Sequence, residues 1–160
     1  MIESLHSPHI ARVKALIGSR GVKERRNAAL FVAEGIQSVR EAITFRAEIS
    51  IDTLYLTSNG RHRLEESISL TDVNTVDVSD EVMAAIAETI TPQGILAICS
   101  IPKRTIAQLQ LSGKSRIIYL SEIQDPGNAG TIIRSADAMG MSAIVTSPGS
   151  VDLFSPKVVR

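Results

Sequence analysis

Two polar residues, Asn128 and Arg134, lie six positions apart in a segment that begins at Asp125 and reads DPGNAGTIIRSADAMG. A guanidinium group is a permanent cation that can bind a phosphate through two hydrogen bonds and can stabilise negative charge on an oxygen. Asn128 is at the position expected for a helix N-cap, where its side-chain oxygen would accept a backbone N–H. On spacing alone, a surface arginine and a helix cap are the commoner interpretations of this pair.

A strand–turn–helix–strand unit is predicted to position these residues. Ile117–Leu120 is a four-residue apolar run, typical of a strand that is buried on both faces. Apolar residues at helical spacing predict a helix from Ala129 to Met139, which ends at Gly140, and Ala143–Val145 predicts a second buried strand. Such a unit implies a parallel sheet, whose ligands bind at the carboxyl ends of the strands, here the turn Glu122–Gly130.

The same segment resembles the first signature motif of the SpoU/TrmH family of RNA 2′-O-ribose methyltransferases, whose pattern is Asp-Pro-x-Asn-x-Gly-x-x-x-Arg-x-Ala. The final segment SPKVVR resembles the part of the family that leads into the next helix. A Rossmann dinucleotide loop would need G-x-G-x-x-G, which this segment does not supply. The residues that match the SpoU/TrmH pattern are Asp125, Pro126, Asn128, Gly130, Arg134 and Ala136.

The resemblance implies transfer of a methyl group from S-adenosylmethionine to a ribose 2′-hydroxyl in RNA, with rRNA preferred over tRNA. It implies that Arg134 is catalytic and binds a phosphate and the 2′-oxygen, since a guanidinium is a poor general base. It also implies that Asn128 is catalytic and holds Arg134 in position. The cofactor-binding residues are expected beyond Arg160. The structural turn of the motif would consist of Asp125, Pro126 and Gly130.

Charge is unevenly distributed along a chain whose formal net charge is zero. Residues 1–28 contain six Lys or Arg side chains and only two Glu, so the N-terminus is basic and the remainder is acidic. A local phosphate-binding patch would have this distribution, and a solvated amphipathic helix would explain it equally well. The candidate RNA-binding residues are Arg12, Lys14, Arg20, Lys23, Arg25 and Arg26.

A small α/β domain is predicted for residues 1–103. Ser7 and Pro8 predict the start of a helix over His9–Ile17, which ends at Gly18–Gly21. The segment FVAEGIQSVREAI, residues 31–43, predicts a strand and a helix, and it resembles the substrate-binding domain that precedes the catalytic domain in SpoU-type enzymes. The resemblance implies a domain similar to a ribosomal RNA-binding protein. The further predicted elements are strands over Ile51–Leu56, Val73–Val78 and Ile95–Ser100, a helix over Arg61–Ser69 and a helix after Ser79.

Residues 104–114 are predicted to be a linker, and residues 115–160 an incomplete parallel-sheet methyltransferase domain of the trefoil-knot type. Its two strands and little more than one helix cannot cover both faces of a parallel sheet. We therefore expect an N-terminal part of a methyltransferase, without the family's second and third motifs and without the cofactor half. Such a chain would be inactive alone, and the complete protein would be a homodimer, as family members are.

Several other classes are disfavoured. No apolar run approaches a membrane span, and the first residues do not have the pattern of a secretory signal. The single Cys99 is predicted to be a buried, inert thiol, which suits a cytoplasmic protein. His6, His9 and His62 are scattered, so no metal site is predicted. A non-enzymatic RNA-binding module, or the relic of a truncated methyltransferase gene, remains the alternative, whereas the missing phosphate loop disfavours a nucleotide-binding protein.

Overall fold

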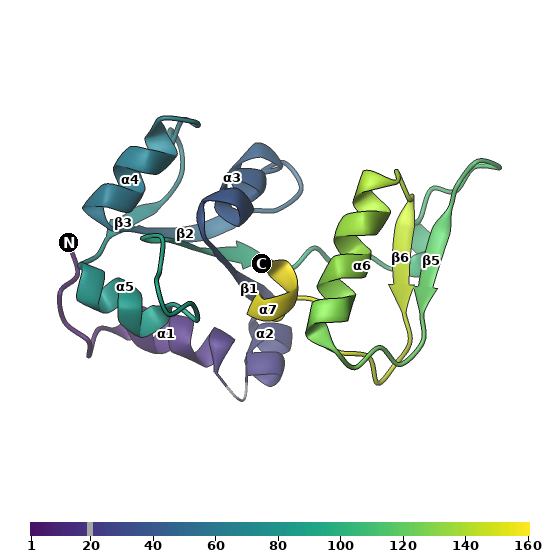
Figure 1. Cartoon of the computed structure of the whole chain (residues 1–160), viewed down its shortest axis with the longest axis horizontal. Coiled ribbons are helices and arrows are strands. Elements are labelled where there is room, and N and C mark those ends of the chain that lie inside the picture. Colours follow the sequence, from purple (N-terminus) through teal and green to yellow (C-terminus); the bar gives the residue numbers. More distant parts are fainter. Residues whose placement is uncertain (19–20) are drawn as a thin grey trace. The chain divides into compact units, whose positions relative to one another are not determined.

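The structure of the protein is a computed structural model that describes residues 1–18 and 21–160. The chain forms two compact units. The N-terminal unit consists of Met1–Pro102 together with Arg160, and the C-terminal unit consists of Lys103–Val159. Each unit combines helices with strands (Figure 1), so the predicted α/β fold class is confirmed.

The N-terminal unit is built on a four-stranded mixed sheet with the strand order β1-β4-β2-β3. Strand β4 runs antiparallel to both of its neighbours, and β3 runs parallel to β2. The predicted strands are therefore present, although β3 is shorter than the predicted Val73–Val78. Their bounds are Leu30–Glu34 for β1, Ile51–Leu56 for β2, Thr75–Asp77 for β3 and Ile95–Ser100 for β4.

Helices cover both faces of this sheet (Figure 1). On one face, α1 (Pro8–Ile17) and α5 (Asp80–Ile86) pack against alternate strand residues. The other face is covered by α3 (Ile36–Thr44) and α4 (Ser58–Glu65). The core between the sheet and the first pair of helices consists of Ile10, Val13, Leu16, Val32, Tyr55, Val78, Val82, Met83, Ile86, Leu96 and Ile98.

The helix starts follow from capping side chains. The Ser7 hydroxyl accepts the backbone N–H of His9 (3.3 Å), and Ser79 caps α5 in the same way, as predicted. Helix α4 begins at Ser58, earlier than the predicted Arg61, because the hydroxyl of Thr57 accepts the N–H of Gly60 (3.1 Å).

A second helix, α2 (Gly21–Ala28), lies in a segment for which we predicted no helix. Its residues are almost all polar, so it lacks the apolar periodicity that indicates a helix in a sequence. A tertiary contact holds it instead. The Arg25 guanidinium is only 3% exposed and donates a hydrogen bond to the carbonyl oxygen of Leu16 in α1.

The C-terminal unit contains the predicted parallel pair, β5 (Ile117–Leu120) and β6 (Ala143–Thr146). They are joined through α6 (Pro126–Ala138) and followed by the short α7 (Pro156–Val159). The predicted linker also belongs to this unit, and a 3₁₀ helix, η1 (Ile106–Gln108), lies within it.

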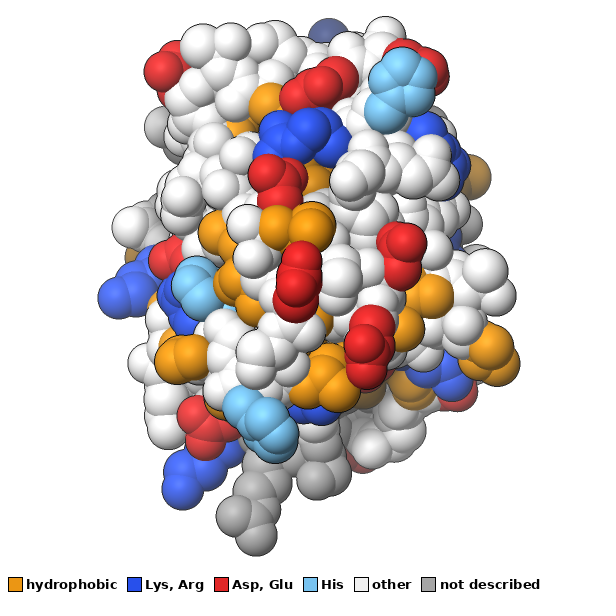
Figure 2. Space-filling model, turned by 90° about the vertical axis from the view of Figure 1, so that its left-hand side faces the viewer, with side chains coloured by type: hydrophobic (Ala, Val, Ile, Leu, Met, Phe, Trp, Pro, Cys, Tyr) orange, Lys and Arg blue, Asp and Glu red, His pale blue; other side chains and the backbone are white. Residues whose placement is uncertain are grey.

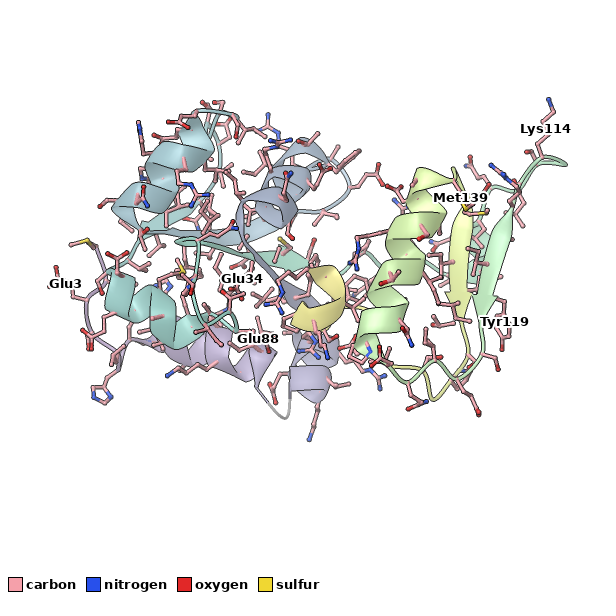
Figure 3. All side chains as sticks on the ribbon, in the orientation of Figure 1. Glu3, Glu34, Glu88, Lys114, Tyr119 and Met139 are labelled. Atoms are coloured by element: carbon pink, nitrogen blue, oxygen red, sulfur yellow. The ribbon has the colours of Figure 1, made fainter. Side chains whose placement is uncertain are left out.

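One prediction for this unit is wrong, because β5 is not buried on both faces. The side chains of Ile117 and Tyr119 are 43% and 62% exposed. Alternate residues of a strand point to opposite faces, and α6 covers only the face of Leu120. Figure 3 shows Tyr119 on the side of β5 that faces away from α6.

Candidate functional site

The first turn of α6 carries the signature motif, and its geometry corrects our assignment of the N-cap. The cap is Asp125, whose carboxylate accepts the backbone N–H of Asn128 (2.7 Å). Asp and Asn are about equally good caps, and Pro126 decides between them because proline is favoured at the first helical position. Asn128 is therefore inside the helix with an exposed side chain.

Arg134 extends from α6 into solvent, and its guanidinium folds back over Gly130, one turn earlier. A Cβ atom built on Gly130 would lie 3.1 Å from a guanidinium nitrogen of Arg134 and 3.1 Å from the carbonyl oxygen of Val158 in α7. Gly130 is thus buried where α7 approaches α6, and its missing side chain leaves room for the guanidinium. Within the described chain, no residue pairs or hydrogen-bonds with the Arg134 side chain, so its donors are available to an anion.

Asn128 does not hold Arg134 in position as we expected. Residues six apart lie about 120° apart around a helix and do not face each other. The Asn128 side chain has no hydrogen-bond partner among the residues that the structure describes. It is therefore free to contact a bound molecule at the start of α6.

The loops that follow β5 and β6 are tied together at the carboxyl ends of these strands. The backbone N–H of Glu122 donates to the Ser147 hydroxyl (2.7 Å), and the Gln124 amide donates to the carbonyl oxygen of Gly149 (2.7 Å). Glu122 has a φ of 49°, which is uncommon for a residue other than glycine. Strained backbone of this kind is frequent at functional sites. The sequence analysis placed a ligand-binding turn here but did not identify Gln124 or Ser147, whose roles depend on the loop after the second strand.

The candidate RNA-binding residues of the N-terminal unit fall into different environments. Arg12 donates to the Asp52 carboxylate (2.6 Å), which raises the pKa of Arg12 and lowers that of Asp52. Arg25 is buried and holds α2 against α1, so it is no longer a candidate for an RNA contact. Arg20 lies outside the described residues. The remaining candidates, all exposed and without a partner in the described chain, are Lys14, Lys23 and Arg26.

Figure 2 shows acidic and basic side chains interspersed on one face of the N-terminal unit. The surviving candidates lie on α1 and α2, which pack against each other. A small basic site formed by these two helices is therefore the remaining candidate for a contact with RNA.

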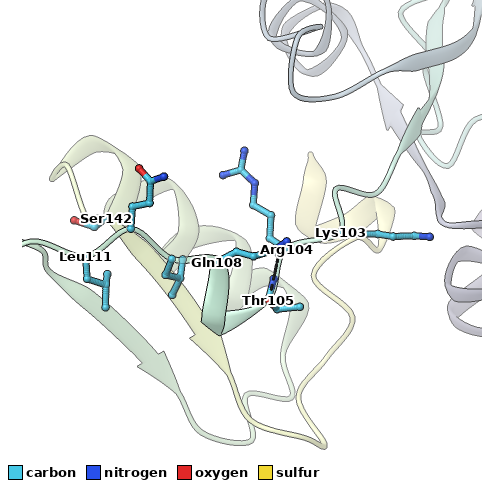
Figure 4. A pocket seen from close by; sticks show the side chains of 8 residues that line it. Lys103, Arg104, Thr105, Gln108, Leu111 and Ser142 are labelled. Carbon is cyan, nitrogen blue, oxygen red and sulfur yellow. Dashed lines mark hydrogen bonds between the residues drawn. The ribbon is translucent and has the colours of Figure 1, made fainter.

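The other features that the structure describes show no second catalytic arrangement. A hollow beside η1 is lined by residues that include Lys103, Arg104, Gln108 and Ser142 (Figure 4), and it contains no carboxylate. Cys99 is fully buried, and burial raises the pKa of its thiol to about 12, as expected for an inert cysteine. In the part of the chain that the structure describes, no three His, Cys, Asp or Glu side chains are grouped to hold a metal ion. Among the described residues, no helix has both the length and the apolar character that a membrane crossing requires.

Two family models match the chain. Residues 8–97 match a model described as an MRM3-like substrate binding domain, and residues 115–160 match the SpoU rRNA Methylase family. The 23S rRNA (guanosine(2553)-2′-O)-methyltransferase RlmP of Bacillus subtilis (strain 168) is 31% identical over 138 residues, which are 86% of this chain and 52% of that relative. The mitochondrial rRNA methyltransferase 3 of Homo sapiens is 29% identical over 94% of this chain and 36% of its own length.

Solved structures of rRNA methyltransferases also match this chain. An rRNA methyltransferase from Sinorhizobium meliloti matches 99% of this chain and 59% of its own chain, with a TM-score of 0.83 and 27% identity. An AdoMet-bound rRNA methyltransferase from the same organism matches with the same TM-score. The chain thus spans about half the length of RlmP and about a third of the human relative.

Proposed function

Because the chain belongs to the SpoU family of rRNA methylases, with an MRM3-like substrate-binding domain before the methylase region, we propose that the protein methylates the 2′-hydroxyl of a ribose in rRNA. In this proposal the N-terminal unit binds the RNA and the C-terminal unit carries part of the catalytic site. RlmP and the human mitochondrial relative are both named as rRNA methyltransferases, which supports rRNA as the substrate.

The unpaired guanidinium of Arg134 is the observation that carries the proposal. It lies over Gly130 in the first half of α6, the helix that follows β5. A guanidinium can bind a phosphate of the RNA backbone through parallel hydrogen bonds. This contact would fix the nucleotide whose ribose is modified.

Arg134 would also stabilise the charge that develops during the reaction. As the 2′-hydroxyl gives its proton to water, negative charge develops on its oxygen, the atom that would accept the methyl group. A permanently charged donor stabilises this charge without accepting the proton itself. We assign Asn128, which is exposed on the first turn of α6, to a direct contact with the substrate.

S-adenosylmethionine, the methyl donor implied by the family, supplies an electrophilic methyl group when bound. The hollow in Figure 4 does not fit this group, because its lining contains no carboxylate that could attract the sulfonium cation. We therefore assign no residue of this chain to the cofactor. The residues that bind it are expected beyond Arg160.

The RNA contact of the N-terminal unit is proposed for Lys14, Lys23 and Arg26, which are exposed and unpaired. Lysine and arginine contacts to phosphates position RNA without reading its sequence. We also propose that the complete protein is a cytoplasmic homodimer. The single buried cysteine suits a reducing compartment.

The test is methyl transfer by the complete protein to rRNA that lacks the modification, followed by digestion and mass measurement of the 2′-O-methyl nucleosides. Arg134→Ala should lower the rate by about 100-fold or more, the usual effect of removing a transition-state donor. Lys114→Ala, which removes an exposed cation of the same unit, should leave the rate unchanged.

Either of two results would contradict the proposal. A folded Arg134→Ala protein with a normal rate would remove Arg134 from the mechanism. A complete protein that binds rRNA but transfers no methyl group would favour the RNA-binding module instead.

A further inference from the structure

The loop between α5 and β4 exposes an isoleucine completely. The side chain of Ile90 is 102% exposed, the highest value among the large hydrophobic residues of the described chain. Single exposed apolar side chains are common and need no explanation by themselves. This loop differs because hydrogen bonds fix the backbone on both sides of Ile90.

A buried carboxylate holds the first side of the loop. Glu34, at the end of β1, is only 8% exposed, and its carboxylate accepts the backbone N–H groups of Glu88 (2.9 Å) and Thr89 (3.2 Å). It also accepts the hydroxyl of Thr89. Figure 3 shows Glu34 and Glu88 beside each other at this end of β1. Hydrogen bonds to a charged acceptor are stronger than neutral ones, so this side of the loop is firmly anchored.

The second side of the loop is anchored to two other elements. The side-chain carbonyl of Gln93 accepts the backbone N–H of Ile36 at the start of α3 (2.8 Å). The carbonyl oxygen of Gly94 accepts the backbone N–H of Thr57 after β2 (3.0 Å). Because both ends of the loop are fixed, little conformational entropy of its backbone should be lost when Ile90 binds a partner.

We propose that the loop Glu88–Gly94 contacts a single-stranded part of the RNA substrate, with Ile90 packed against the face of an unstacked base. This inference rests on the proposed function, which supplies RNA as the substrate. Sequence-specific RNA recognition uses mainly single-stranded regions, whose bases are open to side-chain contacts. The only charged residue of this loop is Glu88, whose exposed carboxylate would repel a phosphate, so a base fits the loop better than a phosphate does.

Polar side chains flank Ile90 along the loop. Thr91 and Gln93 border a hollow together with Ser38 of α3, and its lining also includes the charged residues Glu34 and Arg160. Hydroxyl and amide groups can donate to or accept from the edge of a base. The loop thus offers an apolar contact and hydrogen-bonding groups together, as base recognition requires.

A protein partner fits the loop less well. The exposed Val22 belongs to α2, before β1 begins, and Phe45 ends α3. Both therefore lie toward the start of β1, whereas the loop of Ile90 is bound to Glu34 at the end of that strand. Specific protein interfaces are built around a larger buried apolar centre.

The proposal also predicts two separate contacts with one RNA. Lys23 and Arg26 precede β1, whereas Glu34 ends it, and a five-residue strand is about 16 Å long. The cations of α2 would bind phosphates, and this contribution weakens as salt increases. Contact of Ile90 with a base involves no charge and should be nearly independent of salt.

The experiment measures binding of the chain to a fluorescent single-stranded 12-nucleotide uridine RNA and to a duplex RNA of the same length, at several salt concentrations. Ile90→Ser should weaken binding of the single strand about fivefold, a reduction below that for an aromatic stacking residue. It should not change duplex binding or the salt dependence. The matched control is Ile106→Ser, which alters an exposed isoleucine of the other unit and should have no effect.

A second measurement locates the contact directly. A single strand containing 4-thiouridine should crosslink to residues 88–94 in the parent chain. The proposal is overturned if Ile90→Ser binds the single strand normally, if the crosslink maps elsewhere, or if the variant changes only the sedimentation of the chain, which would indicate a protein partner.

Failure of this inference can be distinguished from failure of the proposed function. If the complete protein methylates rRNA while the Ile90→Ser variant binds the single strand normally, only the loop proposal is wrong. If the complete protein neither binds nor methylates rRNA, the proposed function is wrong as well. Thermal unfolding of the Ile90→Ser variant should match that of the parent chain, because Ile90 makes no buried contact.

Discussion

Strands β4 and β5 are both apolar runs, ILAICS and IIYL, but they are buried to very different extents. The five residues Ile95–Cys99 are each at most 1% exposed. In β5, by contrast, Ile117 and Tyr119 are 43% and 62% exposed. Strand β4 lies between two other strands with helices on both faces, whereas β5 pairs only with β6 in the described chain.

This difference shows that an apolar run determines what a strand can bury, whereas its neighbours determine what it does bury. Each 100 Å² of apolar surface removed from water contributes about 2.5 kcal/mol to the free energy of folding. The N-terminal unit obtains this contribution on both faces of its sheet. The C-terminal unit obtains it chiefly on the face covered by α6, so its strands should open at lower free energy.

The largest expected effect tests this contrast with one truncation in each sheet. Leu96→Ala should lower the free energy of unfolding by about 2–5 kcal/mol, because it leaves a cavity in a fully buried core. Ile117→Ala in β5 should change it by no more than about 0.5 kcal/mol. Urea unfolding of both variants, followed by circular dichroism, gives the two values. Equal effects would mean that the outer face of β5 is covered in solution.

The elements of the fold could be predicted wherever local chemistry determines them. The caps Ser7 and Ser79 and the apolar strands were found because each depends on neighbours in sequence. Helix α2 could not be found, since it has no apolar face and depends on the contact between Arg25 and a carbonyl oxygen of α1. Net charge likewise could not show that Arg25 is buried.

The candidate site was predicted in type but not in geometry. The motif located Arg134, and helical spacing placed Gly130 one turn before it. The sequence analysis assigned the cap to Asn128, whereas the structure gives it to Asp125, with Pro126 at the first helical position that proline favours. The exposed Ile90 had no signal in the sequence, because an isoleucine between two threonines is also typical of a strand.

A smaller effect on stability is expected from a comparison of a buried and an exposed carboxylate within the N-terminal unit. Glu34→Gln should lower the free energy of unfolding by about 1–2 kcal/mol, because the neutral amide replaces charge-assisted hydrogen bonds to the loop. The amides of Glu88 and Thr89 should then exchange with deuterium faster than those of α5.

Glu88→Gln is the matched control for this measurement, since Glu88 is exposed and close in sequence to the same loop. It should leave both stability and exchange unchanged. If the two variants behave alike, the anchoring of the loop by Glu34 is not a feature of the protein in solution, and the preorganised contact proposed for Ile90 loses its basis.

The smallest expected effect is a dependence of the N-terminal unit on pH. The hydrogen bond from Arg12 lowers the pKa of Asp52 in the folded chain, against a smaller opposing effect of burial. The ion pair should therefore stabilise the fold fully above about pH 4, the pKa of an unfolded aspartate, and this contribution should disappear as the pH falls further. Because both side chains are partly exposed, the effect should be below about 1 kcal/mol.

Asp52→Asn separates this contribution from general acid effects. The loss of stability between pH 7 and pH 3 should be smaller in Asp52→Asn than in the parent chain, whereas Asp72→Asn, at an exposed aspartate without a partner, should retain the full loss. Protection factors should show the difference in α1 and β2, which the ion pair joins, and not in β5 or β6. A difference that appeared in β5 and β6 instead would contradict the separation of the two units on which the comparison rests, because a local ion pair would then control the stability of both.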